Sequence, residues 1–274
     1  LVLVISLSRH LILRSTMNPS LLALCSTAVL PIVGSFIVLA IAGVGLIVWI
    51  SHAVAIALAC AVSYAGYSQG QRHSGQIPAW CILGLMVVGV MLPLLGDASG
   101  PRRWVALGPL NFYMAALVLP SLIVVCEMLI ADKRLLLPYS AVLVTCVVLT
   151  LQPDASQAAA LLVAAIIVAQ HHQVTVGRRV MLVLPLLLLV LWVFSKPDPL
   201  MPVPYVEEVF ATAWQHSVWA GVAVMACGMA LLGGLWRQSS QASAGCAAVA
   251  GYYAILFICS SMGMTPAPLL GYGA

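Results

Sequence analysis

The longest apolar stretch of this chain runs from residue 21 to residue 67 and contains no Asp, Glu, Lys or Arg. A transmembrane helix needs about 20 consecutive apolar residues, so this stretch is long enough for two crossings. Over the whole chain, 63% of the residues are hydrophobic and 7% are charged, whereas about a quarter of the residues in soluble proteins are charged. The sequence therefore predicts an all-α, polytopic transmembrane helix bundle.

The length of 274 residues leaves room for about nine spans. The first stretch supplies two of them, with a turn between Gly43 and Gly45. The other spans are expected at 79–95, 112–131, 135–151, 158–170, 180–194, 209–235 and 242–262. Residues 1–20 are expected to be an interfacial or non-native segment, because Met17 is an alternative start, and residues 21–274 to form one transmembrane bundle.

The charged residues are distributed unevenly over the expected loops. With a cytoplasmic N-terminus, most Lys and Arg lie inside, as the positive-inside rule describes. The basic residues expected outside are Arg102, Arg103 and Lys196. The acids expected outside are Asp97, Asp154, Asp198, Glu207 and Glu208. Because acids contribute little to orientation, their accumulation on one side indicates a polar site on the outer face.

Three short outer motifs could build that site: Arg102-Arg103-Trp104, Gln152-Pro153-Asp154 and Glu207-Glu208. The planar guanidinium of arginine suits a diphosphate, because it makes paired charge-assisted hydrogen bonds. A nearby carboxylate could act as a general base on a sugar hydroxyl. Each motif also has a structural interpretation: an interfacial anchor for the first, a helix-capping turn for the second and dipole-favoured first-turn acids for the third.

Other polar residues carry weaker signals. Glu127 is the acid placed well inside a span, and such acids are functional by default, but it lies near Asp132 and Lys133 and could extend toward the loop. His216 is either a packing or a functional histidine. His171 and His172 have no acid or Cys near them in the sequence, so no metal site is assigned. The eight cysteines lie in or beside apolar runs and are interpreted as packing residues.

The order of these motifs resembles the SEDS family of membrane glycosyltransferases, of the RodA and FtsW type. Gly100-Pro101-Arg102-Arg103-Trp104, followed by Leu107-Gly108, is similar to the family's loop after the third span. Gln152-Pro153-Asp154 stands where the family has Gln-Pro-Asp-Leu-Gly-Thr. Weaker similarity continues through residues 207–221 and ends in residues 263–273, which resemble Pro-Leu-Pro-Phe-Leu-Ser-Tyr-Gly-Gly.

The chain also departs from the family pattern. The family has Gln-Pro-Ser-Glu and a nearby Lys after the arginine-tryptophan motif, whereas this chain has residues 113–116, Tyr-Met-Ala-Ala, and Leu119. The family's large outer loop, which precedes its essential Asp, is shortened in this chain to roughly residues 195–206. The family's essential Asp aligns with Glu207, and its Glu-Glu pair with Gln215-His216. The arginine-tryptophan part of the pattern is thus kept, while the segments expected to face it have changed.

The resemblance implies a polymerase of the lipid-linked disaccharide precursor of peptidoglycan, acting in cell-wall synthesis, cell shape or division at the outer face of the bacterial cytoplasmic membrane. It implies that Glu207 and Asp154 are catalytic, and that Arg102, Arg103, Trp104, Glu208 and His216 bind substrate. It also implies a single-span transpeptidase partner, a class B penicillin-binding protein. No cofactor is assigned, a divalent cation is left open, and the scattered basic residues do not indicate nucleic-acid binding.

Two other functions are compatible with the sequence. A catalytically degenerate member of this fold would serve as a scaffold or lipid-binding protein that recruits a transpeptidase. A small-solute transporter would need polar groups near the membrane midplane, and only Glu127 and His216 are clear candidates for them. Whether the chain is an enzyme therefore depends on the altered segments.

Overall fold

The computed structural model describes residues 19–72, 78–96, 102–107, 110–196, 206–239 and 244–270. The chain divides into two compact units: unit 1 comprises residues 1–74, 202–241 and 256–274, and unit 2 comprises residues 75–201 and 242–255. Most of the expected N-terminal segment, residues 1–18, lies outside the described residues. Each unit is described by itself.

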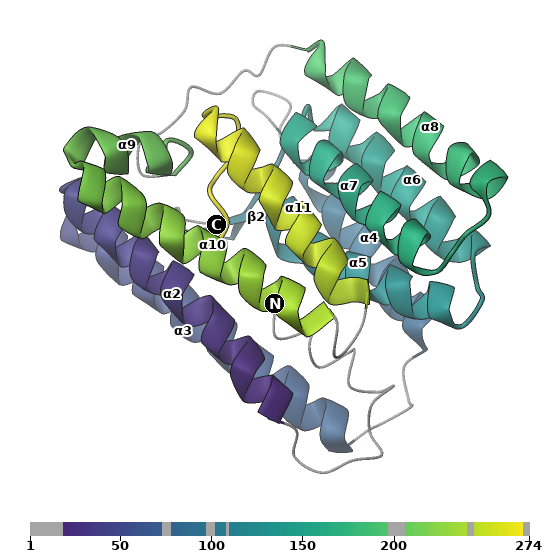
Figure 1. The fold of residues 1–274 in the computed structure, drawn as a ribbon, viewed down its shortest axis with the longest axis horizontal. Coiled ribbons are helices and arrows are strands. Elements are labelled where there is room, and N and C mark those ends of the chain that lie inside the picture. Colours follow the sequence, from purple (N-terminus) through teal and green to yellow (C-terminus); the bar gives the residue numbers. More distant parts are fainter. Residues whose placement is uncertain are drawn as a thin grey trace. The chain divides into compact units, whose positions relative to one another are not determined.

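Unit 1 is built on the helices α2 (Pro19–Ile41), α3 (Leu46–Arg72), α9 (Val209–His216) and α10 (Val218–Ser239). The turn between α2 and α3 uses Gly43 at φ +61°, where glycine has no steric penalty. Helices α2 and α10 lie side by side (Figure 1). They approach closely at Gly34, where a Cβ would lie 3.0 Å from Cys227 Cβ.

The expected span 209–235 is two helices in the structure. Helix α9 ends at His216, and Ser217 is extended (φ −167°, ψ 155°). The Ser217 hydroxyl accepts a hydrogen bond from the Ala220 N–H at 3.1 Å, so serine caps the start of α10. Apolar content alone does not reveal this break, because both helices are apolar.

Unit 2 contains α4 (Ala79–Met91), the 3₁₀ turn η2 (Leu92–Leu95), the strands β1 (Trp104–Leu107) and β2 (Leu110–Tyr113), and four further helices. These helices are α5 (Met114–Ala131), α6 (Leu136–Leu151), α7 (Ala155–His171) and α8 (Val176–Phe194). The first part of α11 (Ala244–Ser261) also belongs to this unit. Helix α5 is its most enclosed element, because it packs on α4, α6 and α7.

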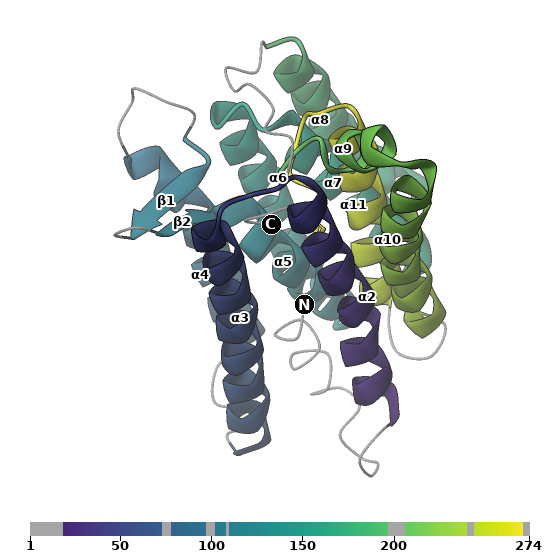
Figure 2. The same cartoon turned by 90° about the vertical axis from the view of Figure 1, so that its left-hand side faces the viewer.

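The polar segment 100–111, expected to be an outer loop, contains most of an antiparallel hairpin. Trp104 pairs with Tyr113 and Leu107 with Leu110. Figure 2 shows this hairpin next to the end of α4, and β1 contacts η2. A two-stranded hairpin is marginal on its own in water, so contacts with the helix ends hold it.

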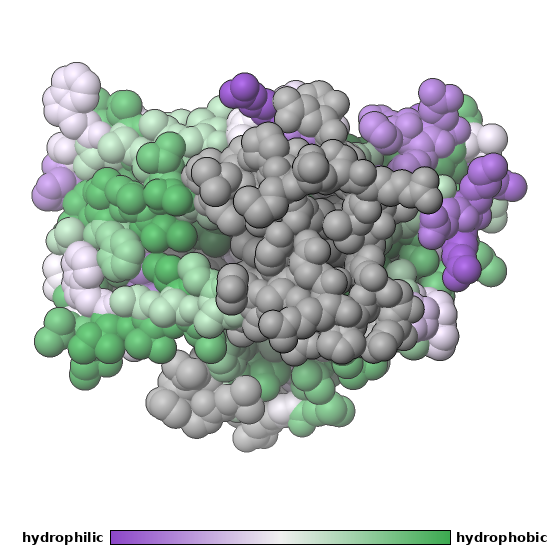
Figure 3. Space-filling model, turned by 90° about the horizontal axis from the view of Figure 1, so that it is seen from below, coloured by the Kyte–Doolittle hydropathy of each residue, from purple (hydrophilic) through white to green (hydrophobic). Residues whose placement is uncertain are grey.

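The all-α transmembrane bundle is confirmed, with this hairpin as the exception among the described residues. Among the described residues, four helices (α5, α8, α10 and α11) qualify by length and composition to cross a membrane. Shorter apolar helical stretches lie at Ala28–Ile41, Leu46–Ala61, Ala79–Leu95, Leu136–Leu151 and Ala155–His171. Exposed apolar side chains such as Leu184, Leu188 and Leu191 of α8 suit contact with lipid. On the face in Figure 3, hydrophobic residues cover much of the described surface, and hydrophilic residues gather on the right.

Two glycines of α10 provide a test of this packing. A Cβ at Gly221 would overlap the indole ring of Trp214 in α9, whereas Gly233 has no atom within 4 Å of such a Cβ. Gly221→Ala is expected to lower the free energy of unfolding by about 1–3 kcal/mol through overpacking. Gly233→Ala is expected to be neutral or stabilising, because alanine favours the helix. Thermal unfolding in detergent measures both changes, and equal melting temperatures would contradict the α9–α10 contact.

Candidate functional site

The centre of the candidate site in unit 2 is the turn that joins α6 to α7. Helix α6 is capped by Gln152, whose N–H bonds to Val148 O at 3.0 Å. Asp154 then caps α7: its side chain accepts a hydrogen bond from the Gln157 N–H at 3.4 Å. Asp154 has no exposed surface and Gln152 is 1% exposed. The turn is thus a buried polar structure between two apolar helices.

Arg103 joins the arginine-tryptophan motif to this turn. Its Nε donates a hydrogen bond to the Gln152 carbonyl at 3.2 Å, and its Nη2 donates to the Pro153 carbonyl. Arg103 is only 6% exposed. Arginine suits this position because its planar fork reaches two acceptors at once. Two motifs about 50 residues apart in the sequence therefore form one unit.

The hairpin supplies a second contact to the same turn. Tyr113 OH donates a hydrogen bond to Asp154 Oδ2 at 2.6 Å. Opposite it on the hairpin, the Trp104 ring stacks on the Tyr113 ring, with centroids 5.0 Å apart and planes at 27°. Tyr113 is therefore fixed by the carboxylate at one end and the indole at its face.

Burial raises the pKa of Tyr113 well above its usual value, and the charge and hydrogen bond of Asp154 raise it further. The phenol consequently keeps its proton at neutral pH and remains a donor to Asp154. A hydrogen bond to the charged form of a carboxyl favours that form.

Further polar groups complete the network. Gln152 Nε2 donates to Val90 O at 2.7 Å, which ties the turn to the end of α4. Tyr252 OH of α11 donates to Gln157 Oε1. Tyr113, Gln157 and Tyr252 were not identified from the sequence, because single polar residues in or beside apolar runs carry no pattern. Tyr113 lies in the segment 113–116 that departs from the family pattern, and this departure is the sequence feature that could have identified it.

The remaining residues of the first motif are more accessible. Arg102 and Trp104 are half-buried. Of the two arginines in this motif, Arg102 is therefore better placed to contact a ligand. Arg103 holds the α6–α7 turn. Lys196, two residues after α8, donates to the Thr150 carbonyl at 3.3 Å. Its Nζ lies 4.0 Å from the centroid of the Trp192 ring.

The predicted acids of unit 1 lie at the start of α9. Glu207 is half-buried, and its carbonyl accepts a hydrogen bond from the Ser260 hydroxyl at 3.0 Å. The neighbouring Val206 carbonyl accepts one from the Ala267 N–H at 3.1 Å. The backbone before α9 is therefore held by the C-terminal segment, which carries the last motif of the family resemblance.

Glu208 and His216 mark the two ends of α9. Glu208 is the half-buried N-cap, and its side chain makes no capping hydrogen bond. His216 is exposed and precedes the break at Ser217. Both residues therefore belong to unit 1 with Glu207, whereas the Arg103–Asp154 network belongs to unit 2.

The structure gives the His171-His172 pair an acidic neighbour that is distant in the sequence. His172 Nε2 lies 3.2 Å from Glu127 Oε1, although the two residues are far apart in the sequence. Helices α5 and α7 pack together, and this packing brings the ends of both to one place. Glu127 is thus paired across helices. In the part of the chain that the structure describes, no three His, Cys, Asp or Glu side chains are grouped to hold a metal ion.

Comparison with known proteins supports the fold. No protein-family model matches the chain, and neither does any curated protein sequence. Among solved structures, the chain is similar to the rod shape determining protein RodA of Thermus thermophilus, with a TM-score of 0.68 and 18% sequence identity. The match covers 95% of this chain and 91% of the RodA chain. The protein therefore has a divergent SEDS-like fold, as the motifs predicted.

A double-mutant cycle tests the buried Tyr113–Asp154 contact. Tyr113→Phe and Asp154→Ala are each expected to lower the free energy of unfolding by about 1–3 kcal/mol, because each change leaves a buried polar group without its partner. The coupling energy is expected to be about 1–3 kcal/mol, since the residues share one contact. Chemical or thermal unfolding in detergent provides the values, and purely additive losses would contradict the contact.

The two arginines are expected to respond differently to replacement by lysine. Arg103→Lys keeps the charge but loses the fork that reaches two carbonyls, so it is expected to cost about 1.5–3 kcal/mol of stability. Arg102→Lys is expected to change stability by less than about 0.5 kcal/mol. The melting temperatures of the two variants test this prediction. A larger loss of stability for Arg102→Lys than for Arg103→Lys would mean that Arg102, and not Arg103, holds the turn.

Proposed function

We propose that this protein is a SEDS-like membrane glycosyltransferase that polymerises a lipid-linked disaccharide. Its substrate would be the diphosphate-linked precursor of peptidoglycan, and its role would lie in cell-wall synthesis that supports cell shape or division. The similar fold of RodA, a rod shape determining protein, supports this proposal. The residues that match the family's motifs support it further.

One observation carries the proposal: the two best-kept motifs contact each other directly. Arg103 donates to the carbonyls of Gln152 and Pro153. A pair of unrelated interfacial features would not need such a contact. Because the contact is buried, it fixes the backbone segment that carries Arg102 and Trp104.

In this proposal Arg102 binds the diphosphate, and Trp104 contacts the bound lipid beside it. Arg103 and the fully buried Asp154 act indirectly, because they hold the hairpin and the α6–α7 turn in place. Binding a dianionic group by guanidinium is strong because the hydrogen bonds are charge-assisted. The binding part of the site thus rests on residues that the chain has kept.

Glu207 is proposed as the general base, with Glu208 and His216 binding the sugars. The Glu207 carboxylate would take the proton of the acceptor sugar hydroxyl as its oxygen attacks the anomeric carbon of the donor. The bond from that carbon to the diphosphate then breaks, and the lipid diphosphate leaves. The hydrogen bonds from Ser260 and Ala267 to the backbone at Glu207 and Val206 would keep this base in place, and positioning matters because about 1 Å of displacement can cost 10²-fold in rate.

The proposed setting is the bacterial cytoplasmic membrane, with the N-terminus in the cytoplasm and the site on the outer face. The excess of Lys and Arg in the loops assigned to the inside supports this orientation. The proposed partner is a single-span transpeptidase of the class B penicillin-binding type, which would cross-link the glycan made here.

A second candidate function is a scaffold that has kept the fold and lost the reaction. It is favoured by the complete burial of Asp154 and by the use of Arg103 for backbone carbonyls, because these polar groups then serve structure. Such a protein would bind the lipid-linked precursor or the transpeptidase without forming polymer.

The test uses the purified chain with a fluorescent lipid-linked disaccharide, alone and with a candidate transpeptidase. Wild type is expected to form glycan polymer, and Glu207→Gln is expected to slow its formation by about 10²–10⁴-fold, the usual contribution of a general base. Gel separation of the labelled glycan measures the rate. Asp132→Asn is the matched control, because it makes the same change at an exposed acid in the α5–α6 turn.

The possible outcomes separate the two functions. Equal polymer from Glu207→Gln and wild type would remove Glu207 from the reaction. If no condition yields polymer while the precursor still binds and Arg102→Ala weakens that binding, the scaffold function is correct. If neither polymer nor precursor binding is found, both functions are wrong.

A further inference from the structure

The end of unit 2 opposite the α6–α7 turn carries a cluster of cations that the proposed glycosyltransferase reaction does not use. Lys133 and Arg134 lie in the turn between α5 and α6, and Arg178 and Arg179 lie in the first turns of α8. Lys133, Arg134 and Arg178 are exposed, and Arg179 is half-buried. We call these four residues the basic end.

Tertiary contacts bring the two loops of the basic end together. The Glu127–His172 pair joins the ends of α5 and α7, and α8 packs on both α6 and α7. Tyr139 lies in the first turn of α6, which packs on α8 near the helix start that carries Arg178 and Arg179. The basic residues of both loops therefore face one region.

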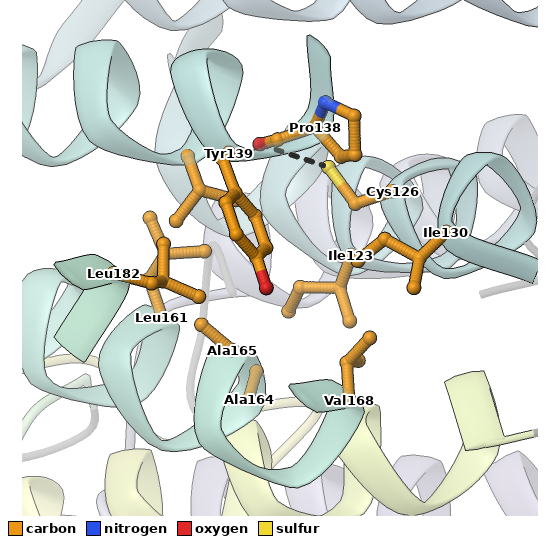
Figure 4. A pocket seen from close by; sticks show the side chains of 11 residues that line it. Ile123, Cys126, Ile130, Pro138, Tyr139, Leu161, Ala164, Ala165, Val168 and Leu182 are labelled. Atoms are coloured by element: carbon orange, nitrogen blue, oxygen red, sulfur yellow. Dashed lines mark hydrogen bonds between the residues drawn. The ribbon is translucent and has the colours of Figure 1, made fainter. Parts of the chain in front are cut away.

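A small cavity lies directly behind the basic end, between α5, α6, α7 and α8. It measures about 20 Å³, which is room for about one water molecule. Figure 4 shows the Tyr139 hydroxyl directed into it, and this hydroxyl has no hydrogen-bond partner. The cavity is too small for an acyl chain, so a ligand at this end must be held from outside, by the exposed cations.

The charge at this end is not balanced by the acids near it. Asp132 is the exposed acid in the α5–α6 turn, and Glu127 is paired with His172. Helices α6 and α8 both begin here without an acid in the first turn and without a side-chain cap. Their N-terminal N–H groups add positive potential, because the helix dipole is positive at this end.

We propose that the basic end binds the headgroup of an anionic phospholipid, with the lipid phosphodiester between Lys133, Arg134 and Arg178. The bounding apolar helices suit a ligand that is itself in the membrane, and the exposed Leu184 and Leu188 of α8 would adjoin its acyl chains. Arg179 positions the loop, since its Nε donates to the Val174 carbonyl at 2.6 Å. The site is independent of the proposed reaction and would select the lipid composition around the protein.

The experiment titrates the full-length chain, in a neutral detergent, with phosphatidylglycerol and with phosphatidylcholine of the same acyl chains. Native mass spectrometry gives the ratio of the two affinities. Lys133→Gln/Arg178→Gln removes one cation from each loop and is expected to weaken phosphatidylglycerol binding by about tenfold, with phosphatidylcholine binding unchanged. Lys196→Gln/Arg237→Gln removes the same charge elsewhere and is expected to keep the wild-type ratio.

Three results would overturn the proposal: equal affinity of wild type for the two lipids, an equal loss in both double variants, or displacement of phosphatidylglycerol by inorganic phosphate in the millimolar range. The last result would identify a general phosphate site instead of a lipid site. If the Lys133→Gln/Arg178→Gln variant fails to fold, wild type in about 0.5 M NaCl provides the same test, since salt screens exposed charges. Unchanged selectivity in high salt would contradict a headgroup held by cations.

Discussion

The candidate site in unit 2 depends on the buried α6–α7 turn. Arg103 binds the carbonyls of this turn, and Asp154 within it caps α7. Polar groups buried among apolar helices are costly unless each finds a partner. Here the Gln152 and Pro153 carbonyls meet Arg103, and Asp154 meets Tyr113. Removing any member leaves a buried group without its bond. The hairpin and the turn are therefore expected to keep one geometry, which a binding site requires.

The SEDS-like motifs fall into two pairs, and each pair is joined by hydrogen bonds within one unit. In unit 2 the arginine-tryptophan motif holds the Gln152-Pro153-Asp154 turn. In unit 1 the C-terminal segment holds the backbone at Val206 and Glu207. Each pairing links segments that lie far apart in the sequence but belong to one unit.

The charged residues of the protein thus serve different physical roles at the two ends of unit 2. At the α6–α7 turn, Arg103 and Asp154 are buried and fully engaged with neighbouring groups. At the basic end, Lys133, Arg134 and Arg178 are exposed and remain available to an anionic partner. A membrane protein with few charges places them where they hold a turn or meet a polar headgroup, because the apolar interior penalises other positions.

The sequence by itself determined the membrane bundle, the approximate bounds of α2 to α8 and α11, and the likeness to the SEDS fold. Long apolar runs with turn residues between them are sufficient for this, since only helices and closed barrels satisfy the backbone in lipid. Tertiary structure decided which polar groups meet: Arg103 with two carbonyls, Tyr113 with Asp154, Tyr252 with Gln157, and Glu127 with His172. It also decided the break at Ser217 and the hairpin at Trp104. These features depend on contacts between residues far apart in the chain, and apolar periodicity contains no information about such contacts.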